Sequence, residues 1–317
     1  MVLAPFLAEL VSGSTPPFAW ILPPVLLTFC AIYGVSALLI REASVRLGGS
    51  PATVLLLGAA FGILNEGVAA RSLFDPSWPA LGALALYGRF GGVNWIWAEW
   101  IVPFHAVWSI SFPVFLFRQL WPGSRSVRLL SDRWCIGLAA VPVAAAVVAS
   151  TVIGSYRITA VDWAAMAAAM GVLIVLAWKL GPLASRWRPL GSFRPSPRFA
   201  AVVGALFFVG GQNGTWLTPS VSRSAVGGFV LVALLYLGVG LFASSLAADG
   251  PDDAPRFAFV LGGIGYYVAL SPLSEFAFGR AGLLPIDVAV LALLILLYRK
   301  RTARRPEGAV AAAVGSA

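Results

Sequence analysis

PATVLLLGAAFGILNEGVAA, residues 51–70, decides the fold class of this chain. Glu66 is its only charged residue, and about 20 mostly apolar residues suffice for an α-helix to cross a hydrocarbon core of about 30 Å. Eight further stretches share this character, namely residues 17–40, 93–116, 135–154, 161–180, 199–217, 225–247, 257–278 and 281–298. A β-barrel would show alternating strands of about ten residues instead. The sequence therefore predicts an all-α, polytopic integral membrane helical bundle with nine transmembrane helices.

The composition of the 317-residue chain is that of a membrane protein. Hydrophobic residues make up 59% and charged residues 11%, whereas about 25% of the residues of a typical soluble domain are charged. This excludes a water-soluble enzyme and a nucleic-acid-binding protein, and it makes the lipid bilayer the expected partner. Two cysteines and a single histidine indicate neither a disulfide framework nor a zinc or haem site. We therefore expect no metal and no cofactor.

The basic residues predict the orientation of the helices. If alternate loops are assigned to the cytoplasm, beginning after the first helix, that side holds 17 of the 22 Lys and Arg residues. Because cytoplasmic loops carry the excess of Lys and Arg, we expect the N-terminus outside and the C-terminus inside. The preference for Arg over Lys indicates a prokaryotic protein of the cell (inner) membrane. Residues 1–298 are expected to form one transmembrane domain, and residues 299–317 a basic, then Ala/Gly-rich cytoplasmic tail without order.

An ionisable side chain inside a span costs about 2.5–3.5 kcal/mol to insert and usually faces a cavity or a partner. We take four such side chains as the candidate cavity and proton-relay residues: Glu66, Glu99, His105 and Glu275. The predicted topology places all four in the outer half of the membrane. The inner half holds no comparable group, so we expect a polar cavity that opens outward.

The second predicted helix can be oriented by its glycines. Gly58 and Gly62 form a GxxxG pair, which lets another helix pack closely. Asn65 and Glu66 project from the same face, because residues three and four apart are neighbours on a helix. One alternative is that Glu66 is a structural carboxylate that pairs with Arg71.

The third predicted helix carries Glu99, Pro103, His105 and Ser109. Proline removes a main-chain hydrogen bond and kinks a helix, so a kink at Pro103 could turn Glu99 and His105 toward one cavity. His105 shares its face with Ser109. A histidine suits proton transfer because an unperturbed imidazole titrates near neutral pH. The alternative is a histidine that only makes structural hydrogen bonds.

Supporting polar residues occur in two other spans. The eighth predicted helix repeats small and hydrogen-bonding residues every four positions, at Gly263, Tyr267, Ser271 and Glu275. The sixth contains Gln212 and Asn213 in a Gly-rich stretch that favours unwinding, and unwound backbone in a membrane bundle lines a cavity.

Three functions fit these features. The first is a transporter or permease for an unknown small solute, with proton coupling through Glu66, Glu99, His105 and Glu275 as an option. The second is a non-catalytic membrane subunit whose polar residues hold helices together. The third is an intramembrane hydrolase that uses Glu and His. Because no nucleophile with an adjacent base stands out, the catalytic residues are unknown and the sequence favours a non-enzyme. Substrate and oligomeric state stay open.

Overall fold

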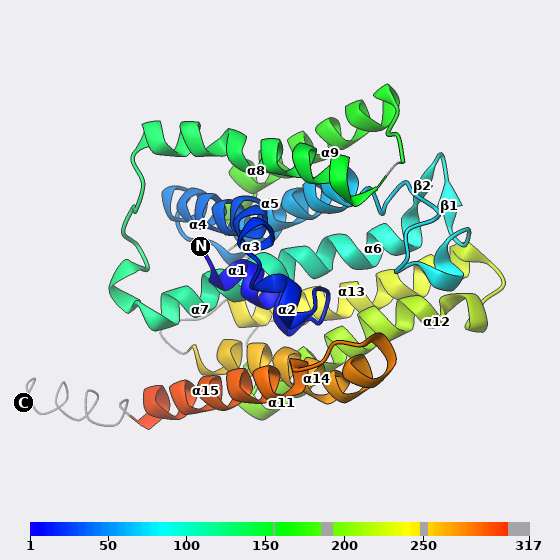
Figure 1. Ribbon diagram of the computed structural model, residues 1–317. Coiled ribbons are helices and arrows are strands. Elements are labelled where there is room, and N and C mark those ends of the chain that lie inside the picture. The colour runs from blue at the N-terminus through cyan, green and yellow to red at the C-terminus, as the bar shows by residue number, and fades with distance from the viewer. Residues whose placement is uncertain (155, 185–192, 248–252, 304–317) are drawn as a thin grey trace, which may run out of the picture.

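The computed structural model describes residues 1–317 except 155, 185–192, 248–252 and 304–317 (Figure 1). The described chain is almost entirely helical, and its one sheet is an antiparallel ribbon of β1 (Arg89–Phe90) and β2 (Val93–Asn94). This confirms the predicted all-α class.

Seven helical segments of the described chain are long and apolar enough to cross a membrane. They are Pro23–Arg46 (α3 Pro23–Phe29, η2 Cys30–Gly34, α4 Val35–Arg46), Pro51–Ala69 (α5 Pro51–Ile63, η3 Leu64–Ala69), Trp95–Leu120 (α6 Trp95–Phe104, η5 His105–Ser111, α7 Phe112–Leu120), α8 (Asp132–Ile153), α9 (Ala160–Lys179), Ala225–Phe242 within α13 (Ala225–Ala247), and α14 (Ala254–Phe278). The predicted class, a multi-pass membrane protein, is therefore confirmed.

Two further helical segments fall on the sixth and ninth predicted spans. The first consists of α11 (Pro197–Phe208), η7 (Val209–Asn213) and α12 (Gly214–Val221), and the second is α15 (Leu283–Ala303). The count of nine crossings and the orientation stay predictions. The shorter elements are α1 (Leu3–Pro5), η1 (Phe6–Val11), α2 (Pro17–Trp20), η4 (Gly82–Leu84), η6 (Pro122–Ser124) and α10 (Gly181–Ala184).

Local chemistry explains where the helices begin and end. Ser50, Asn94, Ser131 and Ser196 each cap a helix by accepting a hydrogen bond from a first-turn N–H, and Thr159 forms a capping box. The first long helix begins at Pro23 instead of residue 17, because proline suits the first helical turn. The last helix continues to Ala303, so the expected tail is helical over 299–303, and residues 304–317 lie outside the described part.

Residues 3–11 form a largely buried segment that the sequence analysis did not expect. Leu7 and Val11 are buried, and the Trp108 indole N–H donates to the Leu7 carbonyl oxygen at 2.7 Å. The Met1 carbonyl lies directly against Gly34, at a place that a Cβ atom would occupy. In Figure 1 this dark blue segment packs in front of the bundle beside α3. It carries Glu9 into the interior.

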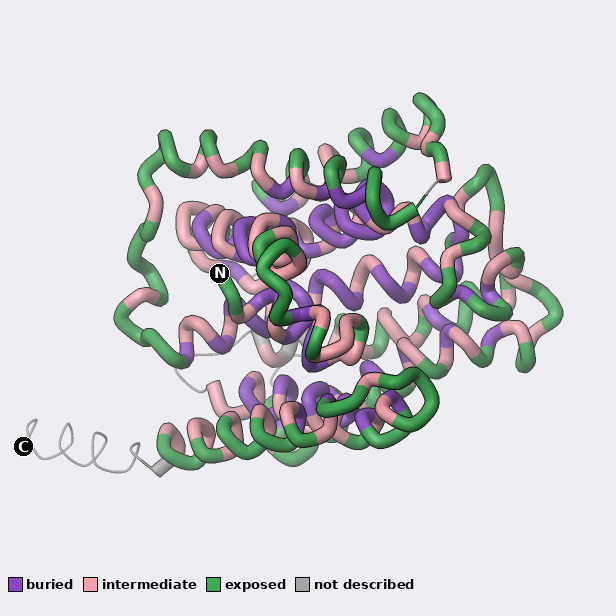
Figure 2. The backbone as a smooth tube through the Cα atoms, viewed as in Figure 1, coloured by how far each residue is buried: buried purple, intermediate pink, exposed green. Residues whose placement is uncertain are grey.

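The long helices divide into an interior and an outer set (Figure 2). The most apolar windows of Pro51–Ala69 and Trp95–Leu120 are each 67% buried, and that of α14 is 56% buried. The corresponding values for α8, α9 and the α13 span are 22%, 11% and 17%. The exposed side chains of this outer set are largely apolar, as expected for helices that face lipid.

The two ends of the bundle differ. At the ribbon end, where β1 and β2 lie, the Arg89 guanidinium donates to the carbonyl oxygens of Ala85, Phe74 and Gly92, and burial lowers its pKa. The opposite end, here the arginine end, holds the last turns of α4, α7 and α15 and the first turns of α8 and α14 (Figure 1). The predicted topology places the ribbon end outside.

Candidate functional site

The centre of the candidate site is a direct contact between the second and third spans. The Nε2 atom of His105 lies 2.8 Å from Oε1 of Glu66. The helices approach closely because a Cβ atom at Gly62 would lie 3.0 Å from the Val102 carbonyl oxygen and 3.2 Å from Cβ of His105. The predicted role of the Gly58 and Gly62 pair in close packing is therefore confirmed.

A chain of hydrogen bonds extends from this contact to the N-terminal segment. The Asn65 amide donates to Oε1 of Glu66 and to the Tyr33 hydroxyl, both at 3.0 Å. The Tyr33 hydroxyl donates in turn to Oε1 of Glu9, whose other carboxylate oxygen accepts from Thr15 at 2.7 Å. Two carboxyl groups and one imidazole thus belong to one polar network.

The second oxygen of Glu66 also has a partner. It accepts a short hydrogen bond from the Ser72 hydroxyl, whose oxygen accepts from the Trp97 indole N–H at 2.9 Å. Ser72 and Trp97 are buried. Both oxygens of the Glu66 carboxyl group are therefore held in place.

Ser109 completes the surroundings of His105. Its hydroxyl oxygen lies 2.9 Å from Nδ1 of the imidazole. With a neutral ring that carries its proton on Nε2, Ser109 donates to Nδ1; with a protonated ring, Nδ1–H donates to Ser109. When His105 gains or loses a proton, rotation of the Ser109 hydroxyl therefore keeps both ring nitrogens hydrogen-bonded.

We call Glu9, Tyr33, Asn65, Glu66, His105 and Ser109 the Glu66–His105 network. Each member lies in a π-helical turn: Glu9 in η1, Tyr33 in η2, Asn65 and Glu66 in η3, and His105 and Ser109 in η5. Such turns are rare and occur frequently at functional sites. The distortion predicted near Pro103 takes this form, since α6 passes into η5 at His105.

The centre of the network is buried. Four of its side chains belong to residues that are at most 7% exposed: Ser109 (0%), His105 (3%), Asn65 (6%) and Glu66 (7%). Phe61 and Phe104 contact the imidazole edge-on, with ring centroids 5.8 and 5.3 Å away. A low local dielectric strengthens these polar contacts and makes an unpaired charge costly.

Two predicted site residues are not part of the network. Glu99 is partly buried, and its Oε2 atom is buried without a hydrogen-bond partner among the described residues. Glu275 accepts from the backbone N–H of Leu284 at 2.9 Å, beyond the end of α14. The expectation that a kink at Pro103 turns Glu99 and His105 together is wrong, because Glu99 lies on another side of the helix, near Tyr236.

Arg71 is not the partner of Glu66. Its guanidinium donates to the carbonyl oxygens of Gly154 and Tyr156 and to the hydroxyl of Ser150, which ties it to the end of α8. The structural alternative in which Arg71 neutralises Glu66 is therefore wrong.

The supporting residues of the sixth and eighth spans form a separate set of contacts. Tyr267 donates to Gln212 at 3.1 Å, and Tyr266 donates to Asn213 at 3.2 Å. The expected unwinding at Gln212 and Asn213 is wrong, since η7 is a π-helical turn and the helix continues to Val221. Ser271 donates to the Tyr267 carbonyl oxygen and contacts the buried Asp287.

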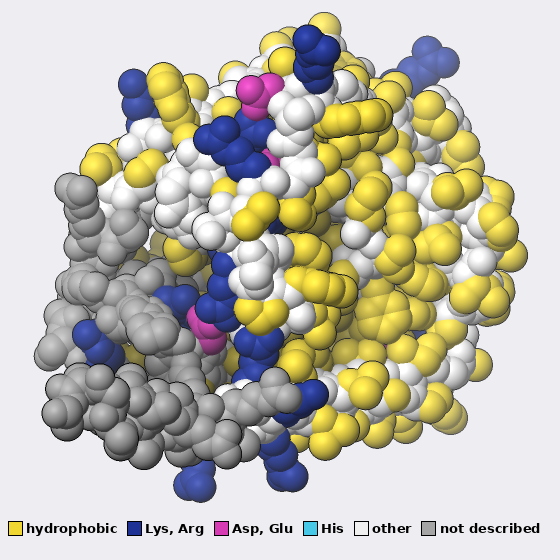
Figure 3. All heavy atoms as spheres, turned by 90° about the vertical axis from the view of Figure 1, so that its left-hand side faces the viewer, with side chains coloured by type: hydrophobic (Ala, Val, Ile, Leu, Met, Phe, Trp, Pro, Cys, Tyr) yellow, Lys and Arg dark blue, Asp and Glu magenta, His cyan; other side chains and the backbone are white. Residues whose placement is uncertain are grey.

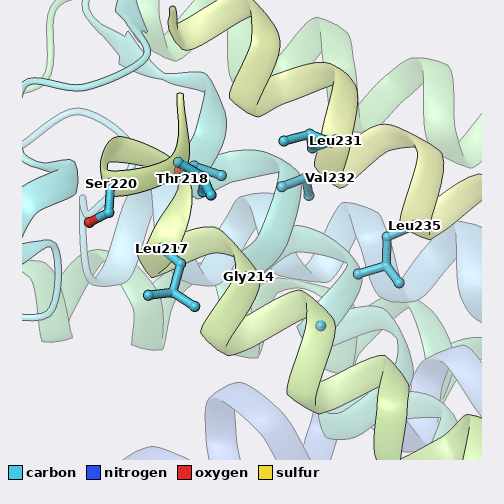
Figure 4. Close-up of a pocket in the computed structure, with 9 residues that line it drawn as sticks. Gly214, Leu217, Thr218, Ser220, Leu231, Val232 and Leu235 are labelled. Atoms are coloured by element: carbon cyan, nitrogen blue, oxygen red, sulfur yellow. The ribbon is translucent and has the colours of Figure 1, made fainter. Parts of the chain in front are cut away.

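A cavity of about 310 Å³ opens beside η7, between α12 and α13. In Figure 4, Leu231, Val232 and Leu235 of α13 lie across it from Leu217 and Thr218 of α12. Its lining is mainly apolar, and none of the four candidate relay residues lines it. The expected outward cavity around Glu66, Glu99, His105 and Glu275 does not coincide with this one.

Sequence reasoning missed several polar residues. Glu9 interrupts the apolar stretch before residue 12, and this isolated charge is the sequence signal that could have identified it as a site residue.

At the arginine end, the fully buried Glu42 pairs with Arg41 at 2.9 Å and with Arg46 at 3.7 Å, and it accepts a hydrogen bond from the Leu129 N–H. The sequence analysis did not single out this buried carboxylate, because it lies just beyond the predicted span 17–40.

No group of three or more His, Cys, Asp or Glu side chains is arranged to hold a metal ion within the part of the chain that is described. Within the network, the Glu66 carboxylate and the His105 imidazole bind each other.

The profile of an uncharacterized membrane protein family matches residues 1–314, so the chain belongs to this family. No curated protein and no solved structure matches the sequence.

Proposed function

We propose that the protein transports a small solute across the membrane and uses Glu66 and His105 as its proton-binding centre. The observation that carries this proposal is the 2.8 Å contact between the two side chains, buried in the bundle and without a Lys or Arg partner among the described residues. Intramembrane carboxylates and histidines that face one another are typical of proton relays in transporters.

The chemistry of the network favours proton binding over a permanent structural ion pair. A histidine changes charge near neutral pH, whereas an arginine stays charged. Ser109 can hydrogen-bond Nδ1 in both protonation states, so a change in charge leaves no ring nitrogen unsatisfied. The Asn65 amide, in contrast, does not relay protons, so Glu9 and the Glu66–His105 pair act as two separate proton sites.

The π-helical turns support movement during a transport cycle. They interrupt the regular hydrogen bonding of several segments at one depth. A change in protonation that weakens the Glu66–His105 contact would let the spans shift at these turns and open the closed centre to one side. We place the protein in the prokaryotic inner membrane because Arg is strongly preferred over Lys and Ala and Gly are abundant.

Two alternatives have less support. In a non-transporting subunit, the network would only join helices. An intramembrane hydrolase would need an accessible nucleophile, and the hydroxyl nearest to His105 belongs to Ser109, which is fully buried.

Proteoliposomes loaded with a pH-sensitive dye test the proposal. A panel of amino acids, sugars, nucleosides, organic acids and amines is added under an imposed membrane potential. We expect at least one solute to acidify the lumen, and Glu66→Gln to slow acidification at least tenfold. Without solute, a pH jump on a solid-supported membrane should displace charge in the wild type and much less in Glu66→Gln.

Glu99→Gln is the matched control, because it makes the same chemical change outside the network. It should retain most of the charge displacement, and size-exclusion profiles should show that both variants fold. A wild type that equals empty liposomes in both assays would contradict the proposal and favour the subunit.

A further inference from the structure

A further buried carboxyl group lies between α14 and α15, and the proposed transport function does not use it. Asp287 of α15 is 0% exposed, and its Oδ2 atom contacts the hydroxyl group of Ser271 on α14. Its other oxygen, Oδ1, is buried without a hydrogen-bond partner among the described residues. A carboxylate in such a place would carry a costly negative charge, because a buried charge needs a partner of opposite sign.

No positive charge neutralises Asp287. It makes no ion pair with any Lys, Arg or His of the described chain. The basic residues of α15 lie near its other end, at the arginine end of the molecule, where Lys and Arg side chains gather in Figure 3. With a rise of 1.5 Å per residue, Lys300 is about 20 Å along the helix from Asp287. The charge that acts on Asp287 is that of Glu275 on α14, which has the same sign and so disfavours a second carboxylate.

The other groups near this contact do not supply a positive charge either. The segment η1 also packs on α15, and its only titratable residue, Glu9, accepts from Tyr33 and Thr15. Arg280 lies in the turn between α14 and α15 and makes no ion pair with the residues that the structure describes. Asp287 is the fifth residue of α15, past the first turn to which the helix dipole is limited.

The hydrogen bonds of Ser271 indicate that Asp287 carries a proton. A hydroxyl group has one hydrogen to donate. The Ser271 oxygen lies 2.8 Å from the Tyr267 carbonyl oxygen, and it also contacts Oδ2 of Asp287. If Asp287 were ionised, both neighbours would be acceptors and one contact would contain no hydrogen. If the carboxyl group is protonated, Asp287 donates to Ser271, and Ser271 donates to Tyr267.

We propose that Asp287 binds a proton at neutral pH and that this proton holds α15 against α14. Loss of the proton leaves an uncompensated charge between the two helices, beside Glu275, and so weakens their contact. This site goes beyond the proposed function. No hydrogen bond of Ser271 or Asp287 leads to the Glu66–His105 network within the described part of the chain, so either proposal can fail without the other.

Infrared difference spectra of the full chain in lipid nanodiscs test the proposal at neutral pH. A protonated carboxyl group has a carbonyl stretch that a carboxylate lacks. The spectrum of the wild type minus that of Asp287→Asn should contain this band. The asparagine amide can still donate to Ser271, so the variant should fold. In Ser271→Ala the band should remain but change position, because the acid loses its hydrogen-bond acceptor.

Thermal unfolding at a series of pH values measures the consequence for stability. Above the pH at which a carboxyl group ionises in the unfolded chain, Asp287 keeps its proton only when the protein is folded, so stability falls as pH rises. Asp287→Asn has no such proton. From mildly acidic to alkaline pH, its Tm should therefore rise relative to that of the wild type by about 2 °C or more.

Asp162→Asn is the matched control, because it makes the same chemical change in the capping box of α9. It should leave the infrared band and the pH dependence of Tm as in the wild type, and Glu66→Gln should also retain the band. Equal spectra of the wild type and Asp287→Asn, loss of the band in Asp162→Asn, or a Tm difference that does not change with pH would overturn the proposal. Stabilisation by sodium chloride over choline chloride that is lost in Asp287→Asn would also overturn it, by assigning the site to a sodium ion.

Discussion

Glu66 and Glu42 are both buried carboxylates, but their partners differ in kind. Glu42 is held at the arginine end by Arg41, Arg46 and the backbone N–H of Leu129. Glu66 is held nearer the ribbon end by an imidazole, an amide and a hydroxyl. Arginine is permanently charged, whereas histidine titrates. Burial alone therefore does not identify a functional carboxylate. The side chain that pairs with the carboxylate decides whether the charge of the pair can change.

The largest loss of stability is expected at the arginine end. Arg41→Met should lower the free energy of unfolding by about 3–5 kcal/mol, because it leaves Glu42 buried without its nearest cation. Reversible unfolding in mixed micelles measures this change.

The double variant Arg41→Met with Glu42→Leu sharpens the result. Replacing both members of a buried ion pair with apolar residues is often close to neutral, so the double variant should be more stable than Arg41→Met alone. An equally unstable double variant would show that Glu42 is not stabilised by charge pairing.

The next largest effect is expected from separating Glu66 and His105 without altering either. In Gly62→Ala the new methyl group meets the Val102 carbonyl oxygen and Cβ of His105. Overpacking of this kind costs about 1–3 kcal/mol, and we expect proton-linked charge displacement to fall with stability.

Gly171→Ala in α9 is the control, because a Cβ atom there meets nothing within 4 Å. Alanine favours the helix over glycine by up to about 1 kcal/mol, so this variant should be as stable as the wild type or more stable. Unchanged stability and charge displacement in Gly62→Ala would contradict the described packing.

A smaller effect is expected for Tyr33→Phe. The change removes the hydroxyl that donates to Glu9 and accepts from Asn65. Hydrogen bonds in membrane bundles contribute about 0.6 kcal/mol on average, so two of them predict a loss of about 1 kcal/mol. If Glu9 and the Glu66–His105 pair bind protons separately, the charge displaced by a pH jump should fall only in part; complete loss would indicate one coupled site.

Trp97→Phe should have the smallest effect on proton binding. It removes one hydrogen bond to Ser72, worth about 0.6 kcal/mol, and the smaller ring leaves a gap in the core that lowers the free energy of unfolding further. Because Ser72 still donates to Glu66, proton-linked charge displacement should stay close to that of the wild type. A loss as large as that of Glu66→Gln would give Trp97 a direct role.

The sequence predicted the membrane class and the contact between two spans for a physical reason. Long apolar stretches report helices that must satisfy their backbone internally in lipid, and Gly58 and Gly62 identified the face that carries Glu66. His105 was identified because a lone imidazole in an apolar stretch is costly. These signals are local, so a single chain displays them.

The remaining features depend on packing between distant segments. Nothing near Glu9 in the sequence indicates that Tyr33 and Asn65 will meet it, and Arg71 turned to the end of α8 instead of to Glu66. The π-helical turns also escaped detection, because an extra residue in a helical turn leaves no compositional trace. Glu99 was grouped with His105 on the assumption of a sharp proline kink, where the helix instead widens.

A π-helical turn closes its hydrogen bonds one residue later than an α-helical turn, so each turn behaves like a one-residue insertion. Removing a single codon within η3 or η5 would restore regular α-helical winding and change which side chains of that turn face the network, while the helix beyond it keeps its face. The polar centre can therefore be gained or erased in evolution by the smallest change in gene length, with no substitution of an acidic or basic amino acid.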